Sequence, residues 1–168
     1  MEFGFEYWAF IVRWLHVLSG VMWIGLLWYL NFVQTPTMPK IPAELKPAIP
    51  KHILPEVLFW FRWAALSTLV WGLVLAWMQG YIGDALAIGL TSGSARDASI
   101  GIGMWMGIIM AFNVWFIIWP AQQKVLGMVE ATDEEKPKAA RTAALASRTN
   151  TLLSIPMLYA MVSAQNLY

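Results

Sequence analysis

The 168-residue sequence contains no cysteine. This absence excludes disulfide bonds, thiolate metal sites, iron–sulfur clusters and the C-x-x-C-H attachment of a c-type haem. Charged residues are also scarce, at 12% of the chain, against about 25% in soluble domains. The net charge is only +1, and no basic cluster is dense enough to follow a phosphate backbone. Nucleic acid is therefore not an expected partner.

Hydrophobic residues make up 59% of the sequence, and 11 Trp and 10 Met suggest lipid interfaces and adaptable packing. Four apolar stretches approach the roughly 20 residues that cross a bilayer, at about residues 10–32, 53–78, 100–119 and 151–167. The last is the shortest and contains Pro156 among several polar residues. The sequence predicts an all-α integral membrane protein, a bundle of four transmembrane helices in one domain over residues 1–168.

The three connections differ in composition. The first, residues 34–51, contains five prolines, which predicts an extended surface segment rather than a regular helix. The second, residues 79–99, is rich in Gly and Ser. The third, residues 120–148, is charged, and its Ala-rich part from 139 to 148 predicts a helical lead-in to the fourth span.

Basic residues gather in two of these connections: Lys40, Lys46 and Lys51 in the first, and Lys124, Lys136, Lys138, Arg141 and Arg148 in the third. The N-terminal segment and the second connection have one each, Arg13 and Arg96. Basic loops stay in the cytoplasm, so both termini are expected outside. The expected location is the inner membrane of a bacterium, as a multi-pass protein.

Polar residues inside the first apolar stretch fall on one helical stripe, which comprises Arg13, His16, Gly20, Trp23, Leu27, Asn31 and Gln34. Ionisable residues in a membrane are costly and mark candidate functional sites. The stripe is expected to face the bundle interior, and the small residue Gly20 to let a neighbour or ligand approach closely.

His16 has three open interpretations. Neutral imidazole is a natural axial ligand of haem iron, which predicts a b-type haem. A bond to a neighbouring helix or contact with a substrate are the alternatives. His52 lies at the opposite end of the second helix, too far to ligate the same haem. Four methionines at helical spacing offer a sixth ligand but more often pack the core: Met106, Met110, Met157 and Met161.

Other intramembrane polar residues have less specific roles. Arg62 is a candidate partner of a haem propionate, a lipid phosphate or an anionic substrate, or it extends toward the headgroups. Asn113, Asn150 and Ser154 are candidates for substrate contact or for hydrogen bonds between helices. No nucleophile–base pair, metalloprotease motif, carboxylate dyad or phosphate-binding loop is present in the sequence.

Three stretches together resemble a known family: residues 13–25 (RWLHVLSGVMWIG), 113–124 (NVWFIIWPAQQK) and 147–157 (SRTNTLLSIPM). They are similar to the membrane domain of bacterial membrane-bound urate hydroxylases, the urate oxidase N-terminal-type family. The first stretch alone is also similar to helices of copper-resistance-type proteins and of membrane protoporphyrinogen oxidases. The third stretch is the most specific.

The resemblance implies oxidation of urate to 5-hydroxyisourate, with water as the oxygen source and a cytochrome c as electron acceptor. In that family a cytochrome c domain follows the membrane domain, whereas this sequence ends at Tyr168 without cysteine. The expectation is a membrane redox subunit that passes electrons to a separate cytochrome c, with Arg13 and His16 at its centre. The alternative is a non-catalytic accessory subunit of a larger respiratory or photosynthetic complex. A transporter is less favoured, because no internal repeat is visible.

Overall fold

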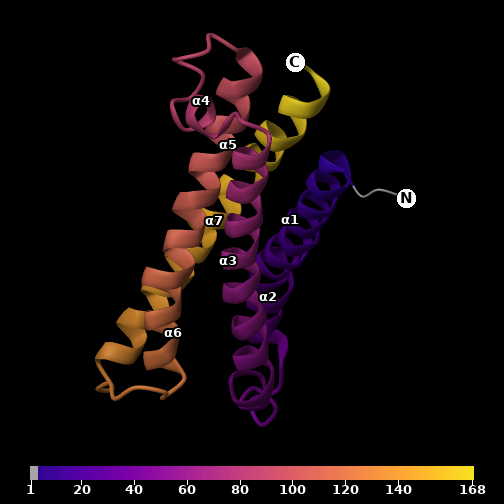
Figure 1. The fold of residues 1–168 in the computed structure, drawn as a ribbon. Helices are drawn as coiled ribbons and strands as arrows, with labels where there is room; N and C mark the ends of the chain where they lie inside the picture. The colour runs from indigo at the N-terminus through magenta and orange to yellow at the C-terminus, as the bar shows by residue number, and fades with distance from the viewer. Residues whose placement is uncertain (1–3) are drawn as a thin grey trace.

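The computed structural model describes residues 4–168, and every regular element in this range is helical. Four long helices dominate it (Figure 1): α1 (Phe5–Trp28), α3 (Leu54–Met78), α5 (Ala95–Phe112) and α7 (Glu135–Asn166). Shorter elements connect or extend them: η1 (Tyr29–Gln34), α2 (Thr35–Thr37), η2 (Met38–Lys40), η3 (Ile49–Ile53), α4 (Ile82–Leu86), η4 (Asn113–Ile118) and α6 (Trp119–Val125). The predicted all-α class is confirmed.

The long helices form two pairs, α1 with α3 and α5 with α7 (Figure 1). Ser19 on α1 and Ser67 on α3 share a hydrogen bond of 2.8 Å, and Ser99 on α5 and Ser163 on α7 share another of 2.8 Å. Figure 1 shows the C-terminus and α4 at one end of the molecule, and α2 and α6 at the other. The two basic connections therefore lie at the same end, as an up-and-down bundle requires.

Three helical runs are long and apolar enough to cross a membrane: Phe5–Lys40, Ile49–Met78 and Ala95–Val125. They contain the first three predicted stretches and extend them at one or both ends. The fourth predicted stretch, residues 151–167, lies almost entirely within α7, which begins sixteen residues earlier, at Glu135. The predicted lead-in and the fourth stretch are thus one continuous helix, with Pro156 inside it.

The proline-rich connection is not one regular helix, as predicted, but it is not extended either: short helical elements form its two ends, and residues 41–47 between them form bends and turns. Short helical elements follow one another up to Lys40, and the cap residue Ile41 then has an extended backbone, with ψ of 132°. Pro36, Pro39 and Pro50 each stand in the first turn of α2, η2 and η3. A proline costs little there, because its missing N–H would have no partner within the helix. Each proline starts a new turn instead of preventing one.

The core lies between the two helix pairs and is built from large apolar side chains. Trp23, Leu27, Phe61, Met110 and Val114 are almost completely buried there. Met157 is also buried in this cluster, and Met106 and Met161 pack against it. The methionine stripe therefore has the packing role that is usual for it. Large apolar residues on the outer faces of the helices stay exposed, as in a protein surrounded by lipid.

Candidate functional site

His16 lies half-buried between α1 and α3, with its ring held in one orientation. Its Nδ1 is 2.8 Å from the backbone carbonyl oxygen of Thr68. A carbonyl oxygen only accepts hydrogen bonds, so Nδ1 carries the proton and donates it. Nε2 consequently keeps a free lone pair. A histidine that donates through one nitrogen to a backbone carbonyl is the common arrangement of a metal-ligating imidazole.

A glycine on α3 makes room for this ring. A Cβ atom added to Gly72 would lie 2.8 Å from Cε1 of His16, which is closer than real Cβ contacts allow. A Cβ added to Gly20 would lie 3.8 Å from Cγ2 of Thr68, an ordinary contact. The close approach expected at Gly20 therefore occurs at Gly72, because the side chain that needs the space is His16 on the facing helix.

Trp23 stands two turns from His16 on the same face of α1 and is only 2% exposed. Its indole Nε1 is buried and has no hydrogen-bond partner among residues 4–168. Buried indole N–H groups usually find an acceptor. The chain therefore presents an unused donor in its interior, about 10 Å along the α1 axis from His16.

Arg13 and His52 do not join His16 at one site. Arg13 is exposed, near the outer end of α3. Burial raises the pKa of Tyr81 at that end, and the charges of Arg96 and Arg13 offset part of the rise. His52 is exposed on η3, about 24 Å along the α3 axis from Thr68. This spacing agrees with the prediction that the two histidines cannot share one haem.

Arg62 is stacked on aromatic rings instead of facing His16. Its guanidinium carbon lies 3.8 Å from the centroid of the Trp119 ring and 5.4 Å from that of Phe59. Trp115 also donates its indole N–H to the Arg62 backbone carbonyl at 3.1 Å. A stacked cation of this kind gains about 0.5–2 kcal/mol from the ring, depending on its solvation. The structure thus joins Arg62 to η4 and α6 and separates it from His16 by nearly two turns.

Asn113 and Asn150 contact each other across two helices. The Asn113 amide donates to Oδ1 of Asn150 at 2.8 Å, and the Asn150 amide donates to the backbone carbonyl of Met110 at 2.9 Å. Asn150 is completely buried. These bonds use the polar atoms of Asn150 on a neighbouring helix, so its role is helix contact.

Ser154 and its neighbours connect α7 to the end of α1. Trp28 donates its indole N–H to the Ser154 hydroxyl at 2.9 Å, and Ser154 donates to the Thr151 carbonyl at 2.7 Å. Asn31 on η1, one turn after Trp28, donates to the Ser147 hydroxyl of α7 at 2.8 Å. These polar contacts join the two helix pairs at the end that contains α2 and α6.

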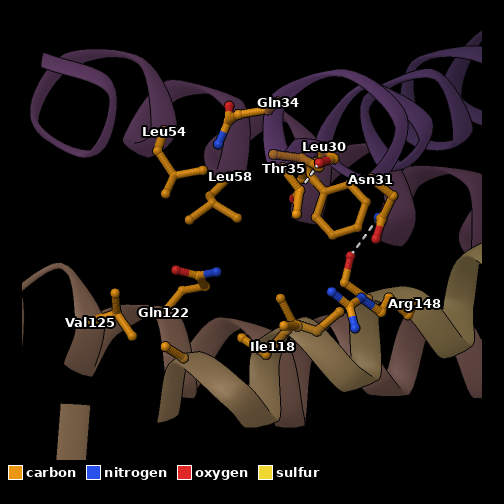
Figure 2. Close-up of a pocket in the computed structure, with 15 residues that line it drawn as sticks. Leu30, Asn31, Gln34, Thr35, Leu54, Leu58, Ile118, Gln122, Val125 and Arg148 are labelled. Carbon is orange, nitrogen blue, oxygen red and sulfur yellow. Dashed lines mark hydrogen bonds between the residues drawn. The ribbon is translucent and has the colours of Figure 1, made fainter. Parts of the chain in front are cut away.

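Below them lies a cavity of about 140 Å³ between η1, α3, α6 and α7 (Figure 2). Figure 2 shows the side chains of Gln34 and Gln122 extending into it from opposite walls. The Oε1 atom of each is buried and has no partner among residues 4–168. Sequence reasoning placed Gln34 on the polar stripe but did not identify the cavity. The sequence signal for it was a glutamine shortly after each of two apolar stretches, Gln34 after the first and Gln122 after the third.

The described residues contain no group of three or more His, Asp or Glu side chains that could hold a metal ion. One histidine with a free Nε2 remains compatible with a haem, since the porphyrin itself supplies four of the iron ligands.

The comparisons with known proteins give one match. Residues 85–167 match a protein-family model described as urate oxidase N-terminal. No curated protein and no solved structure matches the chain. The matched range covers about half of the chain, from α4 to the end of α7, and includes two of the three stretches that carry the resemblance. The stretch around His16 lies outside it. The segment from residue 85 to residue 167 belongs to the urate oxidase N-terminal family.

Proposed function

We propose that α7 is a fourth membrane span. Large apolar side chains form one outward stripe along its second half, where Leu152, Ile155, Tyr159 and Val162 are 60–74% exposed. The opposite face carries small and polar residues: Ala160 and Ser163 contact α5, and Ser154 contacts Trp28 at the end of α1. Small residues inside and large apolar residues outside are typical of helices that pack within a bilayer. No 18-residue window of α7 is as apolar as those of the three runs above, because the inner face of its second half carries polar residues such as Asn150, Ser154 and Ser163.

The basic connections at the end containing α2 and α6 support a cytoplasmic location for that end. Both termini then lie outside, and His16 lies in the outer part of the membrane. In a bacterium this arrangement corresponds to a multi-pass protein of the inner membrane.

We further propose that the protein is a membrane redox subunit of the urate-oxidising type. The observation that carries this proposal is the hydrogen bond from His16 Nδ1 to the Thr68 carbonyl, which leaves Nε2 free to ligate. The family membership of residues 85–167 supports urate as the reductant. A b-type haem, when bound, would supply one-electron transfer to a separate cytochrome c.

The residues present fit such a group. His16 is the candidate axial ligand, Thr68 orients it, and Gly72 leaves space for its ring. Trp23 offers a buried N–H without a partner. Arg13, on the same stripe but exposed, is placed to attract an anion at the outer surface.

The test is a reduced-minus-oxidised visible spectrum of the purified protein, with dithionite and then with urate as reductant. We expect a b-type haem signal that is lost in His16→Ala and retained in His52→Ala. His52 is a matched control, because it is the other histidine of the chain and is exposed at the opposite end. A flat spectrum for the unmodified protein would overturn the redox proposal and favour the accessory subunit.

A further inference from the structure

The cavity between η1, α3, α6 and α7 lies near the ends of the helical runs that are long enough to cross a membrane. Gln34 is six residues before the end of the run Phe5–Lys40, and Gln122 is three residues before the end of Ala95–Val125. A rise of about 1.5 Å per residue places them about 9 Å and about 5 Å from those ends. The runs have 36 and 31 residues, more than the roughly 20 that cross the hydrocarbon. The cavity therefore lies at the level of the lipid headgroups.

Exposed tryptophans mark the membrane side of this level. Trp28 and Trp60 are 37% and 52% exposed, and each is six residues nearer the middle of its run than a residue of the cavity wall, Gln34 or Leu54. Tryptophan gathers where hydrocarbon meets the headgroups. The two basic connections also lie at this end of the molecule. Basic pockets between membrane helices at such an end bind anionic headgroups.

The charge of the lining favours an anion without an attached cation. Arg148 is exposed at the rim (Figure 2) and makes no ion pair among residues 4–168. A guanidinium group pairs with a phosphate group through two parallel hydrogen bonds. The lining contains no Asp or Glu. The choline or ethanolamine cation of a zwitterionic headgroup would therefore have no partner here.

The interior of the cavity suits hydroxyl groups. The Oε1 atoms of Gln34 and Gln122 are buried without a donor among the described residues. A hydroxyl both donates and accepts, so it satisfies either end of a carboxamide. The volume of about 140 Å³ is close to the roughly 150 Å³ of a cavity that holds one benzene ring. Glycerol has as many non-hydrogen atoms as benzene, so one glycerol unit fits and a whole lipid does not.

We infer that this cavity binds the headgroup of an anionic phospholipid that ends in glycerol, such as phosphatidylglycerol. The phosphate group pairs with Arg148 at the rim, the glycerol hydroxyls enter the cavity toward Gln34 and Gln122, and the acyl chains stay in the surrounding bilayer. The bound headgroup joins the two helix pairs, because η1 and α3 belong to one pair and α6 and α7 to the other. Only the assignment to the cytoplasmic leaflet rests on the proposed orientation.

The experiment is native mass spectrometry of the detergent-solubilised full chain, which counts the lipids that stay bound. Phosphatidylglycerol, phosphatidylcholine and phosphatidate are added in turn. We expect one phosphatidylglycerol per chain, and binding of phosphatidylcholine that is about tenfold weaker. Arg148→Gln should weaken phosphatidylglycerol binding about tenfold. Gln122→Leu should weaken binding of phosphatidylglycerol but not of phosphatidate, which keeps the phosphate group and lacks the terminal glycerol.

Matched variants separate this site from a general attraction of anionic lipid to the basic end. Arg141→Gln removes an exposed charge from the same helix, and Gln123→Leu changes the adjacent amide. Neither residue lines the cavity. Both variants should bind phosphatidylglycerol like the unmodified protein, and thermal unfolding should show that all four variants remain folded.

Three results would overturn the inference: equal losses in Arg141→Gln and Arg148→Gln, phosphatidylcholine bound as tightly as phosphatidylglycerol, or no phosphatidylglycerol retained. Displacement of the lipid by inorganic phosphate at millimolar concentration would overturn the lipid as the source of the phosphate group. His16→Ala should bind phosphatidylglycerol like the unmodified protein. A flat haem spectrum with intact lipid binding would overturn the redox proposal alone.

Discussion

Hydrogen bonds that cross between helices hold several single residues inside this bundle. Water is absent from a bilayer interior, so a polar group there has a partner in the protein or none at all. Asn113, Asn150 and Ser154 all have such partners. The indole of Trp23 and the amides of Gln34 and Gln122 do not, among residues 4–168. Unused polar atoms therefore distinguish the candidate sites from the structural contacts.

The position of His16 depends on a missing side chain on the facing helix. We expect Gly72→Ala to push the imidazole away from Thr68 and to cost about 1–3 kcal/mol in unfolding free energy, as overpacking does. Nitrogen NMR of the His16 ring should show loss of the fixed Nδ1–H form. Gly107→Ala is the control, because no side chain or other segment lies within 4 Å of a Cβ at that position. A fixed tautomer that persists in Gly72→Ala would contradict the role of Gly72.

Asn150 provides a second prediction at this scale. Asn150→Ala removes two hydrogen bonds: it leaves the Asn113 side-chain amide without its acceptor, and the Met110 carbonyl keeps only its bond from the Asn113 backbone N–H. We expect a loss of about 1–3 kcal/mol in unfolding free energy, measured by denaturation in mixed detergent micelles. Asn166→Ala serves as control: its amide bonds only to the Val162 carbonyl of its own helix, and the residue is exposed. A loss of similar size in both variants would argue against an interhelical role for Asn150.

At the scale of elements, the start of α7 is stabilised by a reciprocal pair of bonds. The Thr132 backbone N–H donates to Oε2 of Glu135 at 2.9 Å, and the Glu135 N–H donates to the Thr132 hydroxyl at 3.2 Å. This is a capping box. The Thr132 N–H bond, followed by the bond and charge of Lys124 at 3.4 Å, lowers the pKa of Glu135 from its ordinary value of 4.5.

A lowered carboxyl pKa predicts the direction of the pH effect. The stabilisation of the α7 start is fully present above pH 4.5 and is lost as the pH falls through the lowered value of the folded state. Hydrogen exchange at the Thr132 amide should therefore lose protection in acid, after correction for intrinsic exchange. Glu135→Gln should remove this pH dependence, since its amide does not titrate. Because Glu135 is exposed, raised salt should reduce the contribution of Lys124.

The crossing of α7 can be tested directly, because the chain contains no cysteine. Leu152 and Tyr159 are exposed on the protein surface, at 74% and 66%. If lipid covers them, single cysteines at these positions should resist a membrane-impermeant maleimide in vesicles and react after detergent is added. A cysteine in place of the exposed Thr142, earlier on the same helix, should react once the side of the membrane that it faces is accessible. Rapid labelling at both Leu152 and Tyr159 in intact vesicles would place α7 in water.

At the scale of the whole molecule, the same cysteine-free background reports the orientation. Leu90 in the second connection and Lys138 in the third are exposed, and Lys46 in the first is partly exposed. In spheroplasts we expect an impermeant maleimide to label Leu90→Cys and to leave Lys46→Cys and Lys138→Cys unlabelled until the cells are broken. Labelling of Lys46→Cys and Lys138→Cys from opposite sides would contradict the four-span arrangement.

The first three apolar stretches, the all-α class and, except for the exposed Arg13, the inward-facing stripe of α1 were predictable from the sequence. Apolar length and helical periodicity are local properties, and they determine which residues can span a bilayer and which face is buried. The family resemblance was also local, since motifs such as SRTNTLLSIPM are read along the chain, and the match over residues 85–167 confirms it there. The error was local as well: all five prolines of the first connection were treated as helix breakers, although Pro36, Pro39 and Pro50 stand in first turns.

Tertiary structure decided which of the polar residues meet. The sequence contains no sign that Gly72 would face His16 or that Thr68 would accept its proton, because these residues lie on another helix. It equally contains no sign that Gln34 and Gln122 would border one cavity. Contacts between residues far apart in the chain depend on the register of helix against helix, which the packing of all four helices sets together. The sequence by itself determined the membrane helices, and their packing determined the sites between them.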